Sequence, residues 1–271
     1  MTLKNRNRMI FSLHLLCIAS FFLSILIVFF AFSTQSLNFS ELYNQNNHAL
    51  FSFSSQPIFI LIGIFIQLLF SIISSYVLYR SFVNTQSCQV LFFALFIFAV
   101  LLDAFRLWVF ALNLEQTYSP LFLFCGNTSL ISSLIIPCSL LTMSIVAYTE
   151  QKQDSERFVP IIILTIIFAS TLIPLNTTKV HINYSVDFSF RNIIITYSVL
   201  CYALTLFINF LYNKQRTYNQ KTTIGLLFLM CGVHSIKYSI NLYILILAIF
   251  LLIFGCILYI KELHNQYLWT D

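Results

Sequence analysis

Charged side chains are scarce in this chain of 271 residues: Asp, Glu, Lys and Arg together make up 8%, whereas hydrophobic residues make up 59%. Soluble domains carry about 25% charged residues, so this composition cannot cover a water-soluble surface. The charges are also bunched, and long charge-free runs separate them. A helix needs about 20 mostly apolar residues to cross the hydrocarbon core of a bilayer. The sequence therefore predicts an all-α fold, a polytopic transmembrane helical bundle.

Motifs that carry catalysis or metal binding are missing as well. The seven cysteines include no CxxC pair, and the five histidines show no metal-ligand spacing, which argues against a zinc site or a disulfide framework. The chain has no HExxH, no Walker A loop, no Gly-rich dinucleotide motif and no GxSxG elbow. We therefore expect no enzyme activity and no cofactor. The net charge of +5 follows from membrane topology, so no nucleic-acid partner is expected either.

Glycine and proline are rare, with five of each in the chain. Transporters with broken helices often show paired Gly/Pro interruptions in two halves, and this chain does not. Pro137 is expected to kink the fourth predicted span, because it removes a backbone hydrogen bond there. Small residues of the same span favour a packing helix over a cavity wall; they are Gly126, Asn127, Thr128, Ser129, Ser132, Ser133 and Ser139.

The apolar runs predict about eight membrane spans in one integral membrane domain, residues 1–271, with short loops and no soluble domain. As a single helix, residues 222–260 would be about 58 Å long, roughly twice what a bilayer requires. We therefore expect a tight turn within residues 234–241. Seven spans result if residues 222–239 only dip into the membrane. The eight predicted spans are 10–32, 58–79, 90–112, 120–148, 159–175, 192–212, 222–239 and 241–260.

Charge asymmetry predicts the orientation. With a cytoplasmic N-terminus, ten of the fourteen basic residues face inside, and eight spans place the C-terminus inside too. Tyrosines favour membrane interfaces, and four stand at the inward ends of even-numbered spans: Tyr79, Tyr148, Tyr212 and Tyr259. The expected location is the cell membrane, with loop 33–57 outside and loop 149–158 in the cytosol.

Two opposite charges interrupt the third apolar span: Asp103 and Arg106 stand three residues apart. A charge at the bilayer centre costs at least about 2.5 kcal/mol, so both side chains are expected to face the bundle. Gln67 lies near the middle of the second span, and His234 and Lys237 stand near the outer end of the seventh. Together these five residues predict an outward-facing polar pocket, and its excess of cations would leave room for an anionic ligand. In the alternative interpretation, the Asp103–Arg106 pair only fixes helix packing.

The short loops, the cytosolic N-terminus and the outward polar cluster resemble the input domains of bacterial membrane receptors, which are seven- and eight-helix modules usually fused to kinases or cyclases. The resemblance implies a membrane sensor or signalling subunit that detects a small ligand or a membrane state. The residues after Lys261 are too few for an output domain, and we therefore expect none. If the resemblance holds, the chain acts through a separate cytosolic or membrane signalling partner, besides the lipid bilayer, contacted through residues 149–158, 213–221 and 261–271. A homo-oligomer is another option.

Two other functions fit the same residues. A small-solute transporter, or a membrane subunit of one, would use Asp103 to couple transport to a proton or cation. A structural or assembly factor would use its polar residues for helix packing only. The sensor is the preferred hypothesis.

Overall fold

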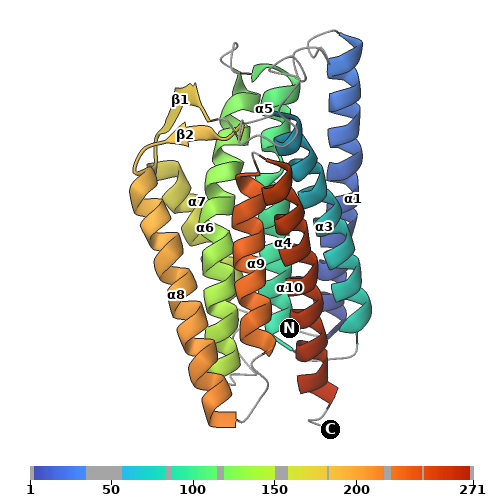
Figure 1. Ribbon diagram of the computed structural model, residues 1–271, viewed down its shortest axis with the longest axis vertical. Coiled ribbons are helices and arrows are strands. Elements are labelled where there is room, and N and C mark those ends of the chain that lie inside the picture. Colours follow the sequence, from blue (N-terminus) through green and yellow to red (C-terminus); the bar gives the residue numbers. More distant parts are fainter. Residues whose placement is uncertain are drawn as a thin grey trace.

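The chain forms an elongated helical bundle with a small two-stranded sheet at one end (Figure 1). The computed structural model describes residues 3–34, 57–83, 87–114, 119–149, 158–181, 183–216, 221–239 and 241–268. The predicted loops 33–57 and 149–158 therefore lie almost entirely outside the described residues. The elements are α1 (Leu3–Ser33), α3 (Pro57–Ser81), α4 (Gln89–Asp103), α5 (Arg106–Ala111), α6 (Pro120–Thr149), α7 (Phe158–Leu172), β1 (Leu175–Val180), β2 (Val186–Phe188), α8 (Arg191–Arg216), α9 (Lys221–Lys237) and α10 (Leu242–Leu268).

Within the described ranges, six helices are long and apolar enough to cross a membrane: α1, α3, α4 together with α5, α6, α8 and α10. These helices confirm the prediction of an all-α, multi-pass membrane bundle. The predicted spans 159–175 and 222–239 correspond to shorter helices, α7 with 15 residues and α9 with 17. α9 and α10 are separate helices, and the chain turns between Lys237 and Leu242. α6 remains one helix of 30 residues through Pro137.

The two ends of the bundle differ. The start of α1 and the ends of α3 and α10 meet at one end, which we name the terminal end: Arg6 Nη2 donates to the Phe82 carbonyl at 2.5 Å, and the Phe82 ring lies 5.9 Å from that of His264. The opposite end carries α5 and the antiparallel β1–β2 hairpin (Figure 1), and we name it the hairpin end. The hairpin was not predicted, because residues 176–191, between the predicted spans 159–175 and 192–212, were expected to form an outer loop without strands.

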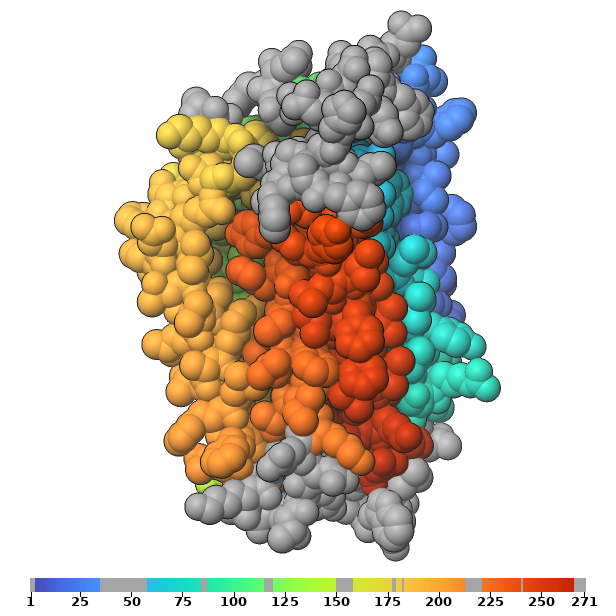
Figure 2. Space-filling model, viewed as in Figure 1, coloured from blue at the N-terminus to red at the C-terminus, as the bar shows by residue number. Residues whose placement is uncertain are grey.

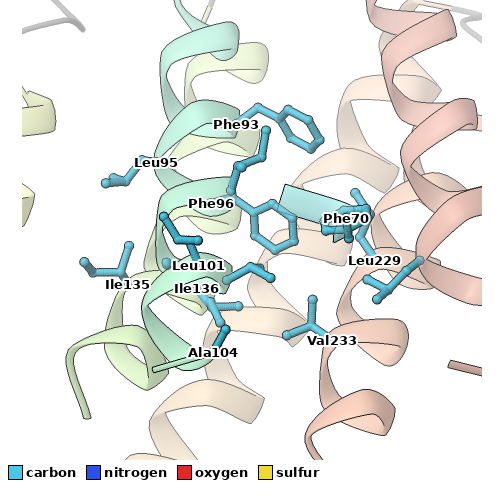
Figure 3. Close-up of a cluster of buried hydrophobic side chains, with 14 of the residues drawn as sticks. Phe70, Phe93, Leu95, Phe96, Leu101, Ala104, Ile135, Ile136, Leu229 and Val233 are labelled. Carbon is cyan, nitrogen blue, oxygen red and sulfur yellow. The ribbon is translucent and has the colours of Figure 1, made fainter. Parts of the chain in front are cut away.

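α4 is the centre of the bundle. In the most apolar stretch of Gln89–Ala111, which comprises α4 and α5, 83% of the residues are buried, against 22% in α1 and in α8. The side chains that α1, α8 and α10 turn outward are large and apolar, including Phe29, Phe207 and Phe250, as expected of a surface that faces lipid rather than water. Figure 3 shows Phe96 of α4 pointing towards Phe70 of α3 and Leu229 of α9. These three side chains belong to the buried apolar core.

α9 and α10 pack so closely that glycine is needed between them. A Cβ atom at Gly232 would lie 2.9 Å from the backbone nitrogen of Leu252, and one at Gly255 would lie 2.9 Å from that of Leu229. Small residues let the backbones of membrane helices approach each other and pack by van der Waals contact. Since neither backbone can yield without separating the helices, we infer that α9 and α10 behave as one unit, which we name the α9–α10 pair.

Replacing Gly255 by alanine is expected to destabilise the protein. Alanine stabilises an ordinary helix by up to about 1 kcal/mol relative to glycine, but here the added Cβ overpacks a backbone contact, which costs about 1–3 kcal/mol. The midpoint of thermal unfolding in detergent should therefore fall for Gly255→Ala. Ile253→Leu, on the exposed face of the same helix, is the matched control and should leave the midpoint unchanged. A higher midpoint for Gly255→Ala would show that the contact is loose.

Candidate functional site

Four of the predicted site residues meet in one ion cluster near the hairpin end: Gln67, Asp103, Arg106 and Lys237, which we name the Asp103 cluster. Oδ1 of Asp103 accepts from Lys237 Nζ at 3.0 Å, and Oδ2 lies 3.7 Å from Arg106 Nε. Gln67 bridges the opposite charges, since its Nε2 donates to Asp103 Oδ2 at 3.4 Å and its Oε1 accepts from Arg106 Nη2 at 3.1 Å. The cluster therefore connects α3, α4, α5 and α9.

The cluster is buried and carries more positive than negative charge. Side-chain exposure is 1% for Asp103, 0% for Arg106 and 17% for Lys237, and Gln67 is fully buried. Burying a charge is costly unless it is paired and hydrogen-bonded. One carboxylate here compensates two cations, so one positive charge is left without a carboxylate partner inside the cluster.

The turn between α4 and α5 aligns Asp103 with Arg106. The amides of Ala104, Phe105 and Leu107 each bond the carbonyl three residues earlier, at 3.0–3.3 Å. This pattern is that of a 3₁₀ turn, in which residues i and i+3 eclipse one another. The acid and the base are therefore stacked along the helix, which brings the guanidinium to the carboxylate.

Arg106 also closes the end of α9. Its Nη1 donates to the carbonyl of Lys237 at 3.1 Å and to the carbonyl of Asn183 at 3.4 Å. The last carbonyls of a helix lack partners within the helix, and the negative end of its dipole favours a cation. Asn183 Nδ2 donates to the same Lys237 carbonyl at 3.4 Å. The β-hairpin and the end of α9 are thus connected to the ion cluster through one guanidinium.

Sequence reasoning missed three partners of the cluster. Ser129 Oγ donates to Asp103 Oδ1 at 3.4 Å, and Ser133 Oγ lies 3.0 Å from Lys237 Nζ, so α6 also contributes to the site. Ser129 and Ser133 are four residues apart, which places both on one face of α6. This spacing could have indicated a polar face towards the cluster, but it was interpreted as helix packing. For Asn183, which is only 4% exposed, no signal in the sequence pointed to the cluster.

His234 does not join the Asp103 cluster. It is exposed on α9, where its ring lies 5.0 Å from that of Tyr238. Instead it lines a pocket of about 480 Å³ between α6, α8 and α9, under the hairpin. Figure 2 shows the hollow between α8 and α9. Ser129, Ser133 and Lys237 line the same pocket, so the pocket reaches the ion cluster from the side of the bundle.

A second polar group holds the hairpin to α8. His181 Nε2 lies 2.9 Å from Asp187 Oδ1, and Arg191 Nη1 lies 3.8 Å from the same oxygen. Arg191 also contacts the His181 ring. The hydrogen bond from His181 lowers the pKa of the Asp187 carboxyl below its ordinary value of 3.8. These side chains are partly exposed, so water screens their attraction.

The described residues contain no group of three or more His, Cys, Asp or Glu side chains that could hold a metal ion. Comparisons with protein-family models, with curated proteins and with solved structures find no match for the chain. The function is therefore inferred from the Asp103 cluster and the pocket beside it.

Removing the carboxylate of the cluster should destabilise the protein more than removing Lys237. Asp103→Asn leaves two buried cations with no anion, and breaking a buried pair in this way costs about 3–5 kcal/mol. Lys237→Gln leaves the Asp103–Arg106 pair balanced, so its cost should be nearer to that of one lost charged hydrogen bond, about 1–3 kcal/mol. The measurement is unfolding of the purified protein in detergent. Arg80→Gln, an exposed charge at the terminal end, is the control, and the reverse order of the two cluster variants would contradict this charge balance.

Acid should loosen the hairpin. A carboxyl whose pKa is lowered on folding stabilises the folded state above its unfolded pKa of about 3.9, and that contribution is lost as the pH falls through the folded pKa. Hydrogen exchange corrected for intrinsic rates should therefore show protection of the Ser185 and Ser189 region falling below about pH 4, while amides in the middle of α8 stay protected. In Asp187→Asn this pH dependence should be absent. An unchanged acid profile in that variant would mean that another group titrates.

Proposed function

We propose that the protein is a multi-pass membrane sensor in which the Asp103 cluster responds to a ligand in the adjoining pocket and the α9–α10 pair carries the response to a separate partner. The observation that supports this most is the position of Lys237. Its amine pairs with Asp103 at 3.0 Å, and Lys237 is also among the residues that line the pocket. An anion in the pocket would therefore compete directly with Asp103 for this cation.

We also propose an orientation for the bundle in the membrane. We propose eight crossings, with α4 and α5 forming one and the short helices α7 and α9 included. By this count the terminal end, with both termini, faces the cytosol, and the hairpin end faces outside. Positive charges favour the cytosolic side, and several lie in the parts of α1, α3, α9 and α10 nearest the terminal end: Lys4, Arg8, Arg80, Lys221 and Lys261. α7 and α9, with 15 and 17 residues, are only about 22–26 Å long at 1.5 Å per residue. To cross the membrane they require local thinning of the bilayer, which membranes accommodate at modest cost.

The packing offers a route from the pocket to the cytosolic side. Lys237 is the last residue of α9, and α9 is locked to α10 through Gly232 and Gly255. Release of Lys237 from Asp103 would remove a tether at one end of the α9–α10 pair, while the far end of α10 lies at the terminal end. A ligand that binds one arrangement better than the other shifts the population between the two.

Transport is supported less well by this arrangement. On the terminal side of the Asp103 cluster, α3, α4 and α9 contribute a layer of buried apolar side chains that includes Phe70, Phe96 and Leu229 (Figure 3). A solute released from the cluster towards the cytosol would have to pass through this layer. A sensor needs no such passage, since only the positions of its helices have to change.

The test is capture of the partner. The full chain, tagged at the C-terminus, is crosslinked in cells and purified as the intact protein and as Asp103→Asn. We expect a kinase, cyclase or other signalling protein to be captured, with a yield that changes several-fold in the variant. Ser133→Ala, which removes the hydroxyl contact of Lys237 and a hydrogen bond to the Ser129 carbonyl within α6, leaves all the charges in place. It should change the yield in the same direction, which guards against simple misfolding of Asp103→Asn.

Thr165→Ala, on the exposed face of α7, is the control and should capture as much as the intact protein. Equal yields from all four proteins would contradict the sensor, as would capture of nothing beyond the chain itself.

A further inference from the structure

The pocket between α8 and α9 is built for a particular class of ligand. We propose that it binds a single-chain anionic amphiphile, an acyl chain with a carboxylate or phosphate headgroup, which enters sideways from the membrane. The inference rests on the proposed sensor function for its significance and names the ligand of that same site.

The charges around the pocket favour an anion. Lys237 and Arg191 both line it, at 17% and 29% side-chain exposure, and the described lining residues include no Asp or Glu. Hydroxyl groups stand at the same end, including those of Ser133, Ser185 and Tyr238. Basic pockets between transmembrane helices are a known means of binding lipid headgroups. The cations and hydroxyls would therefore hold the headgroup beneath the hairpin.

The rest of the pocket is apolar. From the level of Lys237 it follows α9 back to Leu227, a distance of about 15 Å at 1.5 Å per residue. Ile195 and Val199 of α8 form the facing wall with Leu206. A volume of about 480 Å³ falls in the range of about 300–1,000 Å³ found for sites of small organic ligands. An extended chain with the charge at one end matches this shape, whereas a small polar solute would leave the apolar wall unused.

The pocket is open to the membrane. Val199 is 60% exposed and Ile195 46% exposed on α8, and Cys231 and His234 are exposed on the facing side of α9. Figure 2 shows the hollow on the side of the bundle rather than at its end. In a bilayer this opening faces acyl chains, so an amphiphile reaches the pocket without leaving the lipid phase.

The experiment uses the full chain in phosphatidylcholine nanodiscs with a photoactivatable diazirine analogue of palmitate, followed by mass spectrometry of the labelled peptides. We expect saturable labelling of α8 and α9 that unlabelled palmitate and lysophosphatidate displace. Zwitterionic lysophosphatidylcholine should displace it at least ten-fold less well. Inorganic phosphate alone should not displace it, because the apolar wall contributes to binding; displacement by phosphate would show that the ligand is a free anion.

Two variants fill the pocket from opposite walls, Val199→Trp on α8 and Cys231→Trp on α9, and each should reduce labelling at least ten-fold. Leu247→Trp, on the exposed face of α10 away from the pocket, should label as the intact protein does. Labelling that persists in both blocking variants would overturn the proposal, as would labelling that lysophosphatidylcholine displaces equally well.

The outcome is separable from that of the sensor hypothesis. Failed labelling with a partner yield that still depends on Asp103 would overturn the ligand class alone. Specific labelling with a partner yield that Asp103 does not affect would overturn the sensor and leave the binding site in place.

Discussion

The pairing of one buried carboxylate with two cations is the constraint on which the rest of this structure depends. Asp103, Arg106 and Lys237 come from three elements, and none of them could be buried in an apolar bundle alone. Their remaining hydrogen bonds recruit further elements, because Gln67 on α3, Ser129 on α6 and the Asn183 carbonyl in the hairpin loop all contribute. The cluster thereby determines which helices must lie side by side at the hairpin end. The apolar contacts below it are compatible with many helix arrangements, whereas the geometry of the ion cluster is compatible with few.

The overall architecture and the centre of the site could be predicted from the sequence because each depends on local information. Long apolar runs predict helices directly, and an acid and a base three residues apart must be near each other. Gln67 and Lys237 were correctly grouped with them by depth in the bundle. The β-hairpin was missed because its strands give little signal: β1 reads LNTTKV, with apolar residues only at its two ends, and β2 has three residues, too few for a run of alternating apolar residues. The Asn183 contact could not have been predicted, since it joins segments far apart in the chain through a backbone carbonyl.

Two pairs of polar residues are each three positions apart, Asp103 with Arg106 and His234 with Lys237, but only the first pair lies together in the cluster. The difference comes from the geometry of the backbone between them. Between Asp103 and Arg106 the backbone forms a 3₁₀ turn with about 3.0 residues per turn, so the side chains are eclipsed. His234 and Lys237 lie within an ordinary α-helix of about 3.6 residues per turn, where three residues leave the side chains about 60° apart. Lys237 consequently turns towards Asp103 while His234 points into the lateral opening. A sequence pattern alone does not distinguish these helices, because no glycine or proline marks the tighter turn.

The surplus positive charge of the Asp103 cluster connects stability with occupancy. A charge without a carboxylate partner in a medium of low dielectric destabilises the folded state. Lys237 lowers this destabilisation only partly, through the 17% of its side chain that remains exposed beside the pocket that it lines. An anion bound beside Lys237 would remove that cost and would stabilise whichever helix arrangement holds it, since a ligand stabilises the state that it binds. The exposed part of Lys237 therefore has two consequences: it lowers the cost of the surplus charge, and in the proposed sensor it would let the cluster respond to an anion that enters from the membrane. A cluster with equal numbers of acids and bases would be more stable and would have no electrostatic reason to respond to an anion.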